Sequence, residues 1–309
     1  MLPKLIRGEV AQLQRDNRSG AADITLSAIK IVRRYLRAIT VRDKAEFLED
    51  LRELCGGLLF AQSAMSSVHN ACVDILSTLS EYRDEDSLNK LRLELEKKLA
   101  KLSERISLAP KRIAGHLSRV LPRGGRILTI SYSSTVTGVL KELKRRGKNF
   151  EVVVMESRPV LEGRRTAQEL VRAKIRTTLI ADAALGEYTR TVDAAVVGAD
   201  AVYRDGSTVN KVGTFPLAVC CRELGKPLYV LTDSSKITTE HAGSYVIEEK
   251  APSELLRSRC PGLRVKNFYF EFTPAKYITA IFSEKGVFQP RIVGKKLTSL
   301  DLPYHRLKA

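Results

Sequence analysis

Several residue patterns that would assign this sequence to a common class are missing from it. Trp is absent, and the four histidines are scattered, so we assign no catalytic role to any of them. The five cysteines are odd in number and show no metal-ligand spacing, which argues against a disulfide scaffold and against a zinc site. We therefore expect reduced thiols, no cofactor, no metal and a cytoplasmic protein.

Long apolar runs are also missing. No run reaches the roughly 18 residues that a membrane-spanning helix needs, and the first residues, MLPKLIRGEVAQLQ, contain no apolar core of signal-peptide length. The hydrophobic content of 44% is ordinary for a globular protein, and 309 residues suffice for about two domains. We expect no membrane partner.

Acidic residues are few relative to basic ones. Lys and Arg number 52 against 35 Asp and Glu, which gives a formal net charge of +17. Such a balance suits anionic partners, for example nucleic acid or phosphorylated metabolites. The basic residues are spread along the chain, however, with only one dense cluster at Lys141–Lys148, and no aromatic-interleaved RNA motif accompanies them. We expect a solvated basic surface and no direct nucleic-acid binding.

The periodicity of apolar residues divides the chain into two parts. Residues 1–120 have helical spacing, most clearly where six apolar residues from Leu88 to Ile106 recur every three or four positions. We expect that stripe to pack within its own domain. Pro122 and the pair Gly124-Gly125 mark the boundary, which predicts a helical domain over 1–120 and a second domain over 121–309.

The second part alternates short apolar runs with helical patterns. The runs are RILTI, FEVVVM, TTLIA, DAAVVGAD and PLYVLT. Near-continuous apolar strands separated by helices indicate an α/β domain with a mainly parallel sheet covered on both faces. In such sheets, ligands bind at the carboxyl ends of the strands.

Polar side chains follow four of these runs. The loops after the first, second and fourth runs hold hydroxyls, charges and helix starts, and the loop after the fifth ends at Lys236. Helix starts with hydroxyls suit an anion, although no loop matches a Gly-rich nucleotide motif. We therefore predict a phosphate-binding cleft. Its candidates are Ser131, Tyr132, Ser133, Glu156, Arg158, Gly163, Asp200, Asn210, Lys211, Gly213 and Thr214.

Each candidate also has a purely structural explanation. Asp200 could cap a turn, and Arg158 could be a surface charge. The run of serines after the first strand could cap a helix, but one hydroxyl is enough for a cap. The convergence of successive strand-end loops is what favours a site.

Three long stretches carry a resemblance to a known family. They are ESRPVLEGRRTA, VVGADAVYRDGSTVNKVGTFPLAVCCRELGKPLYVLT and FEFTPAKYITAIFSEKGV, with a weaker match at NRSGAADI. They resemble the regulatory alpha, beta and delta subunits of translation initiation factor 2B. The same superfamily contains methylthioribose-1-phosphate isomerase and ribose-1,5-bisphosphate isomerase. The resemblance implies a helical domain, a Rossmann-like domain, and a phosphosugar or nucleotide pocket between them.

The resemblance also implies partners. The expected ligand is a sugar phosphate or a nucleoside monophosphate, and Ser19 and Gly20 of the helical domain are expected to face it. A homodimer or higher oligomer, built through the Rossmann-like domain, is expected, as is a translation initiation factor partner.

Three departures from the isomerases bear on catalysis. Their catalytic Cys after the first strand is matched here by Ser131, while the Asp of their Gly-Ala-Asp motif is retained as Asp200. Moving hydrogen between sugar carbons needs an acid–base pair with pKa values near the working pH, which a thiol reaches and an unassisted serine does not. Glu162 stands where the isomerases have Gln, and Gln62 where they have an Arg for phosphate.

Two functions therefore stay open. The first is a non-catalytic, initiation factor 2B subunit-like protein that binds a phosphosugar or nucleotide. The second is an aldose–ketose isomerase of sugar phosphates that uses Asp200 with an altered partner.

Overall fold

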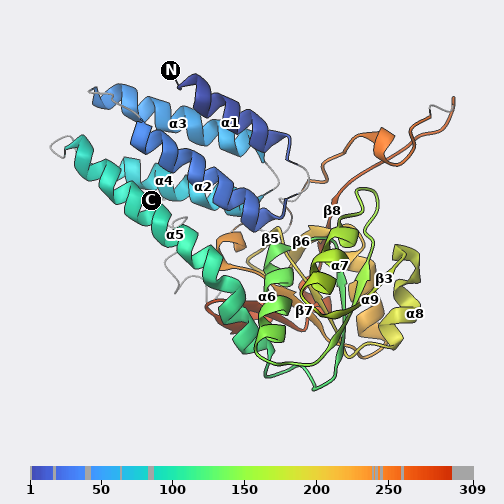
Figure 1. Cartoon of the computed structure of the whole chain (residues 1–309). Coiled ribbons are helices and arrows are strands. Elements are labelled where there is room, and N and C mark those ends of the chain that lie inside the picture. Colours follow the sequence, from blue (N-terminus) through green and yellow to red (C-terminus); the bar gives the residue numbers. More distant parts are fainter. Residues whose placement is uncertain are drawn as a thin grey trace. The chain divides into compact units, whose positions relative to one another are not determined.

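The fold is described from a computed structural model (Figure 1). It describes residues 2–16, 19–38, 43–62, 65–82, 87–238, 240, 243, 246–258 and 261–293. These residues form two compact units, one up to Leu108 and one from Ala109 onward. None of the helices within the described ranges is both long and apolar enough to cross a membrane.

The first unit is helical. Its helices are α1 (Lys4–Gln14), α2 (Ala21–Ala38), α3 (Lys44–Ala61), α4 (Ser66–Ser80) and the first part of α5 (Leu88–Leu117). Their apolar faces share one core, in which Tyr35 stacks on Phe47 and both are fully buried. The apolar stripe of α5 joins this core, with Leu91, Leu95 and Leu99 buried. This confirms that the stripe packs within its own domain.

The division between the units falls inside α5. The sequence places the domain boundary at about residue 120, just after this helix ends at Leu117. The last turns of α5, from Ala109 to Leu117, belong to the core of the second unit.

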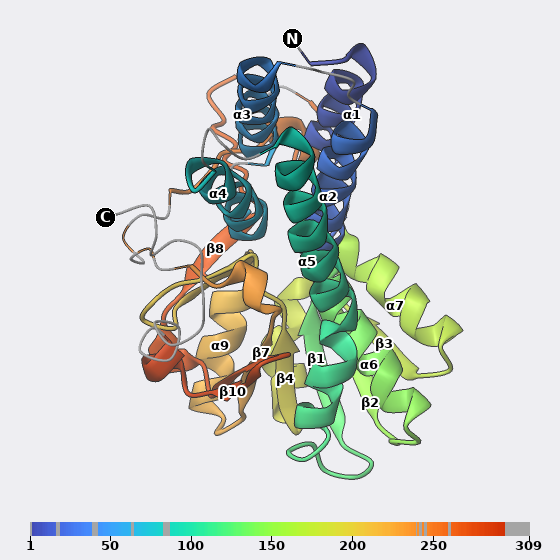
Figure 2. The same ribbon diagram turned by 90° about the vertical axis from the view of Figure 1, so that its left-hand side faces the viewer.

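The second unit is built on a seven-stranded sheet (Figure 2). Its strands are β1 (Arg126–Ile130), β2 (Glu151–Met155), β3 (Arg176–Ile180), β4 (Ala194–Val197), β7 (Leu228–Leu231), β9 (Ala280–Ser283) and β10 (Gly286–Phe288). They lie in the order β10-β9-β7-β4-β1-β2-β3, and all neighbours pair in parallel except β10 with β9. The predicted α/β fold with a helical N-terminal region and a mainly parallel sheet is confirmed.

Helices follow the strands of this sheet. They are α6 (Ser134–Arg145), α7 (Glu162–Arg172), α8 (Leu185–Arg190) and α9 (Thr214–Glu223). The end of α5 packs with α6 and α7 against one set of alternating strand residues, which includes Ile127 and Val152. Helix α9 contacts β4 and β7, and α8 packs on α9. Strands β1, β2 and β4 run in the same direction, so the polar residues that follow them lie at one edge of the sheet, its carboxyl edge.

A small antiparallel sheet interrupts the series after β4. It consists of β5 (Ala201–Val202), β6 (Thr208–Lys211) and β8 (Phe270–Thr273), in the order β5-β6-β8. The sequence predicts a loop after the fourth run, and this prediction is wrong, because β5 and β6 form a hairpin there. The alternation of apolar and polar residues in β5 and β6 is too short to indicate strands. Strand β6 also pairs with β8, which comes about 60 residues later in the chain. Asn210 thereby pairs with Glu271 and Lys211 with Phe270.

Gly163 fixes the start of α7 against the end of β2. A Cβ atom at this position would lie 1.8 Å from the carbonyl oxygen of Met155. Only glycine permits this approach, and the N–H of Gly163 donates to the carbonyl of Glu156 at 3.1 Å. Glu162, the first residue of α7, therefore lies where the start of the helix packs closely against the end of β2.

We expect Gly163→Ala to destabilise the protein by about 1–3 kcal/mol or more, because the added methyl group meets backbone atoms that cannot move aside cheaply. Gly186→Ala is the matched control, since it also lies in a helix but its Cβ would meet nothing within 4 Å. Urea unfolding of both variants measures the difference. Equal stability of the two variants would contradict the close approach.

Candidate functional site

Lys211 and Glu162 form an ion pair at the carboxyl edge of the sheet. Lys211 Nζ donates to Glu162 Oε1 at 2.7 Å, and the side chains are only 3% and 14% exposed. The ammonium group also lies 4.8 Å from the ring centroid of Tyr269. A buried lysine needs such partners because its charge has lost most of its water.

Asp200 lies within electrostatic reach of this pair. Burial raises the pKa of its carboxyl group to about 6, although the ammonium groups of Lys236 and Lys211 act in the opposite direction and Glu162 adds to the rise. The N–H of Asp200 donates to the carbonyl of Val209 at 2.8 Å, which ties it to the hairpin that carries Lys211. A carboxyl group with this pKa can hold or release a proton near neutral pH.

Lys236 lies in the turn that follows β7, and its charge acts on Asp200 by lowering the pKa of that carboxyl group. It is buried, and its Nζ lies 3.9 Å from Oδ2 of Asp233. The turn that carries it, Ser234–Lys236, is held by Glu284, whose Oε2 accepts from the N–H of Ser234 at 3.0 Å. A second buried cation is therefore positioned beside Asp200.

The start of α9 is occupied by a carboxylate of the chain itself. Oε1 of Glu271 accepts from the N–H groups of Gly213 at 2.6 Å and Phe215 at 2.8 Å. Burial raises the pKa of Glu271, whereas these backbone donors favour its charged form. The helix start that the sequence offers to an external phosphate thus already holds an internal anion.

The loop after β1 is tied into the neighbouring loop. Ser131 has a positive φ of 64°, its N–H donates to Ser157 Oγ at 2.7 Å, and its carbonyl accepts from Thr166 Oγ1 at 2.7 Å. The N–H groups of Ser157 and Arg158 donate in turn to the carboxylate of Asp182 at 2.8 and 2.7 Å. Ser131 is therefore held in one backbone geometry by the loops after β2 and β3.

Ser133 and Asn210 meet at Gly198. A Cβ at Gly198 would lie 2.7 Å from Ser133 Oγ and 3.7 Å from Asn210 Oδ1, so the glycine lets both side chains approach the end of β4. Asn210 Nδ2 also donates to Thr214 Oγ1 at 3.0 Å. Ser133 caps α6, accepting from the N–H of Val136 at 3.3 Å. One of the serines after β1 is therefore a helix cap, which is the structural alternative given above for this run of serines.

The structure brings some of the predicted residues together and leaves others outside the group. Asp200 lies within electrostatic reach of Lys211, Asn210 donates to Thr214 and lies with Ser133 beside Gly198, and Gly213 precedes α9. Tyr132 stacks under the guanidinium of Arg165 at 3.6 Å, and Glu156 pairs with Arg164 at 2.8 Å. The side chain of Arg158 is exposed. Ser19 and Gly20 belong to the other unit, ahead of α2, and their part in a pocket stays a prediction.

Four residues of this region were not among the sequence candidates. Lys236 and Glu162 follow β7 and β2, and the sequence places both in strand-end loops, although they were not counted among the ligand-binding candidates. Glu271 lies on β8 and Tyr269 directly precedes that strand, and no local sequence pattern connects either residue to Lys211. Their contribution depends on a strand pairing between distant segments.

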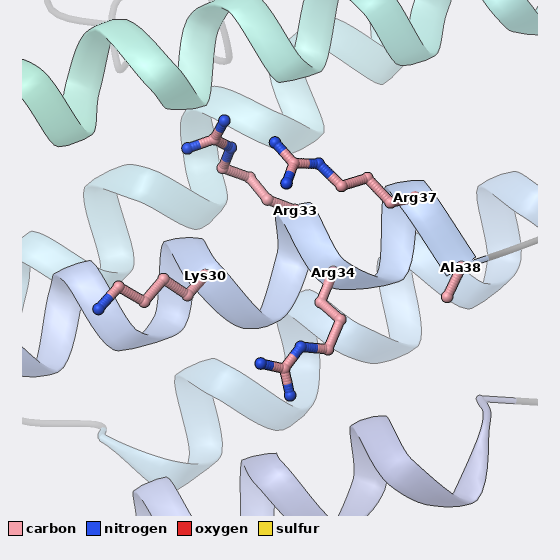
Figure 3. A pocket seen from close by; sticks show the side chains of 5 residues that line it. All are labelled: Lys30, Arg33, Arg34, Arg37 and Ala38. Carbon is pink, nitrogen blue, oxygen red and sulfur yellow. The ribbon is translucent and has the colours of Figure 1, made fainter.

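Another concave surface lies on α2 in the first unit. A pocket of about 360 Å³ is lined by Lys30, Arg33, Arg34, Arg37 and Ala38 (Figure 3). Arg33 and Arg37 bond to Glu96 at 2.7 and 2.8 Å, and Arg34 bonds to Glu9. Glu96 and Glu9 pair with three of these guanidinium groups, and the pocket is lined by one helix without any strand end, so the carboxyl edge of the sheet is the better candidate.

Neither cysteine chemistry nor a metal is indicated in the described part of the chain. Cys55, Cys72, Cys220 and Cys221 form no disulfide, and Cys260 lies outside the described residues. The described residues contain no group of three or more His, Cys, Asp or Glu side chains that could hold a metal ion.

Comparison with known proteins assigns the family. The model of the initiation factor 2 subunit family matches residues 17–290. The chain belongs to this family. The resemblance seen in the sequence motifs is thereby confirmed.

Members of the initiation factor 2 subunit family with different names are similar to this chain. A putative translation initiation factor eIF-2B subunit 2-like protein of Pyrococcus furiosus is 32% identical over 94% of this chain and 98% of its own length. A methylthioribose-1-phosphate isomerase of Acetivibrio thermocellus is 31% identical over 88% of this chain and 84% of its own. A crystal structure of the Pyrococcus horikoshii translation initiation factor eIF-2B superposes with a TM-score of 0.81, at 27% identity, over 94% of this chain and 98% of that one. Membership of the family alone does not choose between the two roles.

The raised pKa of Asp200 predicts a pH-dependent stability. Its protonated form stabilises the fold below its ordinary pKa of 3.8, and this contribution is lost as the pH rises through about 6. Asp200→Asn keeps a neutral group at every pH, so its unfolding free energy should rise relative to the wild type between about pH 4 and about pH 7.5. Denaturant unfolding at both pH values measures this, with Glu223→Gln, at an exposed carboxylate of α9, as control. A constant difference at the two pH values would contradict the raised pKa.

Proposed function

We propose that this chain binds a phosphorylated small molecule, a sugar phosphate or a nucleoside monophosphate, at the carboxyl edge of the seven-stranded sheet. We propose further that it does so without turning the ligand over, as an initiation factor 2B regulatory subunit-like protein. The observation that carries the proposal is the grouping of two buried lysines, Lys211 and Lys236, around Asp200. Buried ammonium groups at strand ends are donors for an anion and for sugar oxygens.

The groups that the structure describes around Asp200 support a binding role. Ser131 stands at the position of the isomerase thiol, and its backbone is fixed by Ser157 and Thr166. No described histidine or cysteine is among the groups that shift the pKa of Asp200. An unassisted serine hydroxyl is too weak an acid and base to relocate hydrogen between sugar carbons near neutral pH.

One observation favours the alternative, an aldose–ketose isomerase. Asp200, with a pKa of about 6, has the proton affinity that a general acid–base catalyst needs. In that case Lys211 or Lys236 would have to stabilise the charge that develops on the sugar oxygen.

Lys211→Ala tests the binding proposal. The substitution removes a charge-assisted hydrogen bond, so affinity for ribose 5-phosphate or a nucleoside monophosphate should fall about tenfold or more by isothermal titration. Lys111→Ala, an exposed lysine of α5, is the control and should bind like the wild type.

Stability and turnover must be measured beside affinity. Lys211→Ala leaves Glu162 buried without its partner, and the double variant Lys211→Ala/Glu162→Ala removes both charges and should also bind weakly. Neither ribose 1,5-bisphosphate nor methylthioribose 1-phosphate should be converted by the wild type. Isomerisation by the wild type that disappears in Asp200→Asn would promote the alternative.

We also propose that the chain forms at least a homodimer through its second unit. This unit exposes large apolar side chains, including Val246 at 80%, Val171 at 57% and Leu263 at 54%. The main support is the resemblance to initiation factor 2B subunits, which implies such assemblies, and a partner that covers these side chains would remove apolar area from water. Light scattering at micromolar concentration should give at least twice the chain mass of 34.4 kDa. A mass equal to one chain would contradict the proposal.

A further inference from the structure

Glu162 uses only one of its two carboxylate oxygens within the described part of the chain. Oε1 accepts from Lys211, whereas Oε2 is buried and accepts no hydrogen bond there. A buried carboxylate oxygen without a donor is costly, so a site of this kind is best satisfied by a donor from a bound molecule. A sugar hydroxyl is such a donor, and a phosphate dianion is not.

The charges around Asp200 also oppose a highly charged ligand. The two cations, Lys211 and Lys236, face the carboxyl groups of Glu162, Asp200 and Asp233. Once Asp200 is ionised, the group carries no excess of positive charge. The start of α9, the other natural anion site of this edge, is held by Glu271.

The backbone at Glu162 is fixed beside the end of β2. Glu162 is the first residue of α7, and the next residue, Gly163, is pressed onto the Met155 carbonyl. Its backbone therefore stays at the end of β2 when a ligand enters. Any anion that reaches Lys211 must compete with a carboxylate that is anchored beside it.

We propose that Glu162 is the residue that sets ligand specificity. It holds Lys211 with one oxygen, receives a sugar hydroxyl with the other, and repels a second phosphate. The site then takes sugars with a single phosphate and discriminates against bisphosphates. This rests on the proposed binding function and names its ligand class.

Glu162→Gln tests the inference by titration calorimetry with ribose 5-phosphate and ribose 1,5-bisphosphate. The amide keeps an acceptor for Lys211 but removes the negative charge and adds a donor for phosphate oxygens. The ratio of the bisphosphate to the monophosphate dissociation constant should fall about tenfold or more relative to the wild type. Glu169→Gln is the control, because Glu169 lies on the same helix and pairs with Lys141 at 2.7 Å. Its ratio should equal that of the wild type.

Thermal unfolding with sulfate tests the same inference if Glu162→Gln is too unstable for calorimetry. Sulfate should raise the unfolding temperature of Glu162→Gln more than that of the wild type or of Glu169→Gln, because Lys211 then lacks a charged partner. A wild type that binds both sugars equally, or an unchanged ratio in Glu162→Gln, overturns the role of Glu162 and leaves the proposed function standing. Binding of neither sugar by wild type or variant overturns both.

Discussion

The bond between Lys211 and Glu162 is the interaction on which the candidate site depends. A lysine that is 3% exposed must be balanced, and the balancing carboxylate comes from a helix start that a glycine holds against β2. This pair, and Lys236 beside it, leave Asp200 among opposite charges without removing its burial, so its pKa still lies at about 6. A neutral substitution of Lys211, Glu162 or Lys236 would therefore change the electrostatic potential at Asp200 and with it the pKa of that carboxyl group.

The small antiparallel sheet is what adapts a parallel-sheet domain to this arrangement. In a simple alternation of strands and helices, the chain would pass from β4 directly into a helix. Here β5 and β6 intervene, so that Lys211 and Asn210 lie on a strand, and β8 brings Glu271 to the start of α9. The internal carboxylates Glu162 and Glu271 thus occupy positions that would otherwise attract external anions. This gives the chain a site with donors and acceptors rather than a simple cationic pocket.

Sequence reasoning predicted the parts of the fold that depend on local pattern. The apolar runs of β1, β2, β3, β4 and β7 and the stripe of α5 all have a period that indicates their structure directly. The strands of the small sheet have no such signal, because β6 is paired with a strand far along the chain. For the same reason Asp200 and Lys211 could be placed together by the strand-end rule, whereas Tyr269 and Glu271 could not. The neutralisation of Lys211 by Glu162 depends on a backbone contact at Gly163 that a sequence does not display.

In the proposed binding mode, this edge of the sheet holds a phosphorylated sugar while Glu162 keeps its bond to Lys211. A crystal structure of the wild type with ribose 5-phosphate tests it most directly. The sugar should lie at the ends of β1, β4 and β6, with a hydroxyl group within hydrogen-bond distance of Glu162 Oε2 and the Lys211–Glu162 bond intact. A sugar bound elsewhere, or a ligand that displaces Glu162 from Lys211, would contradict this binding mode.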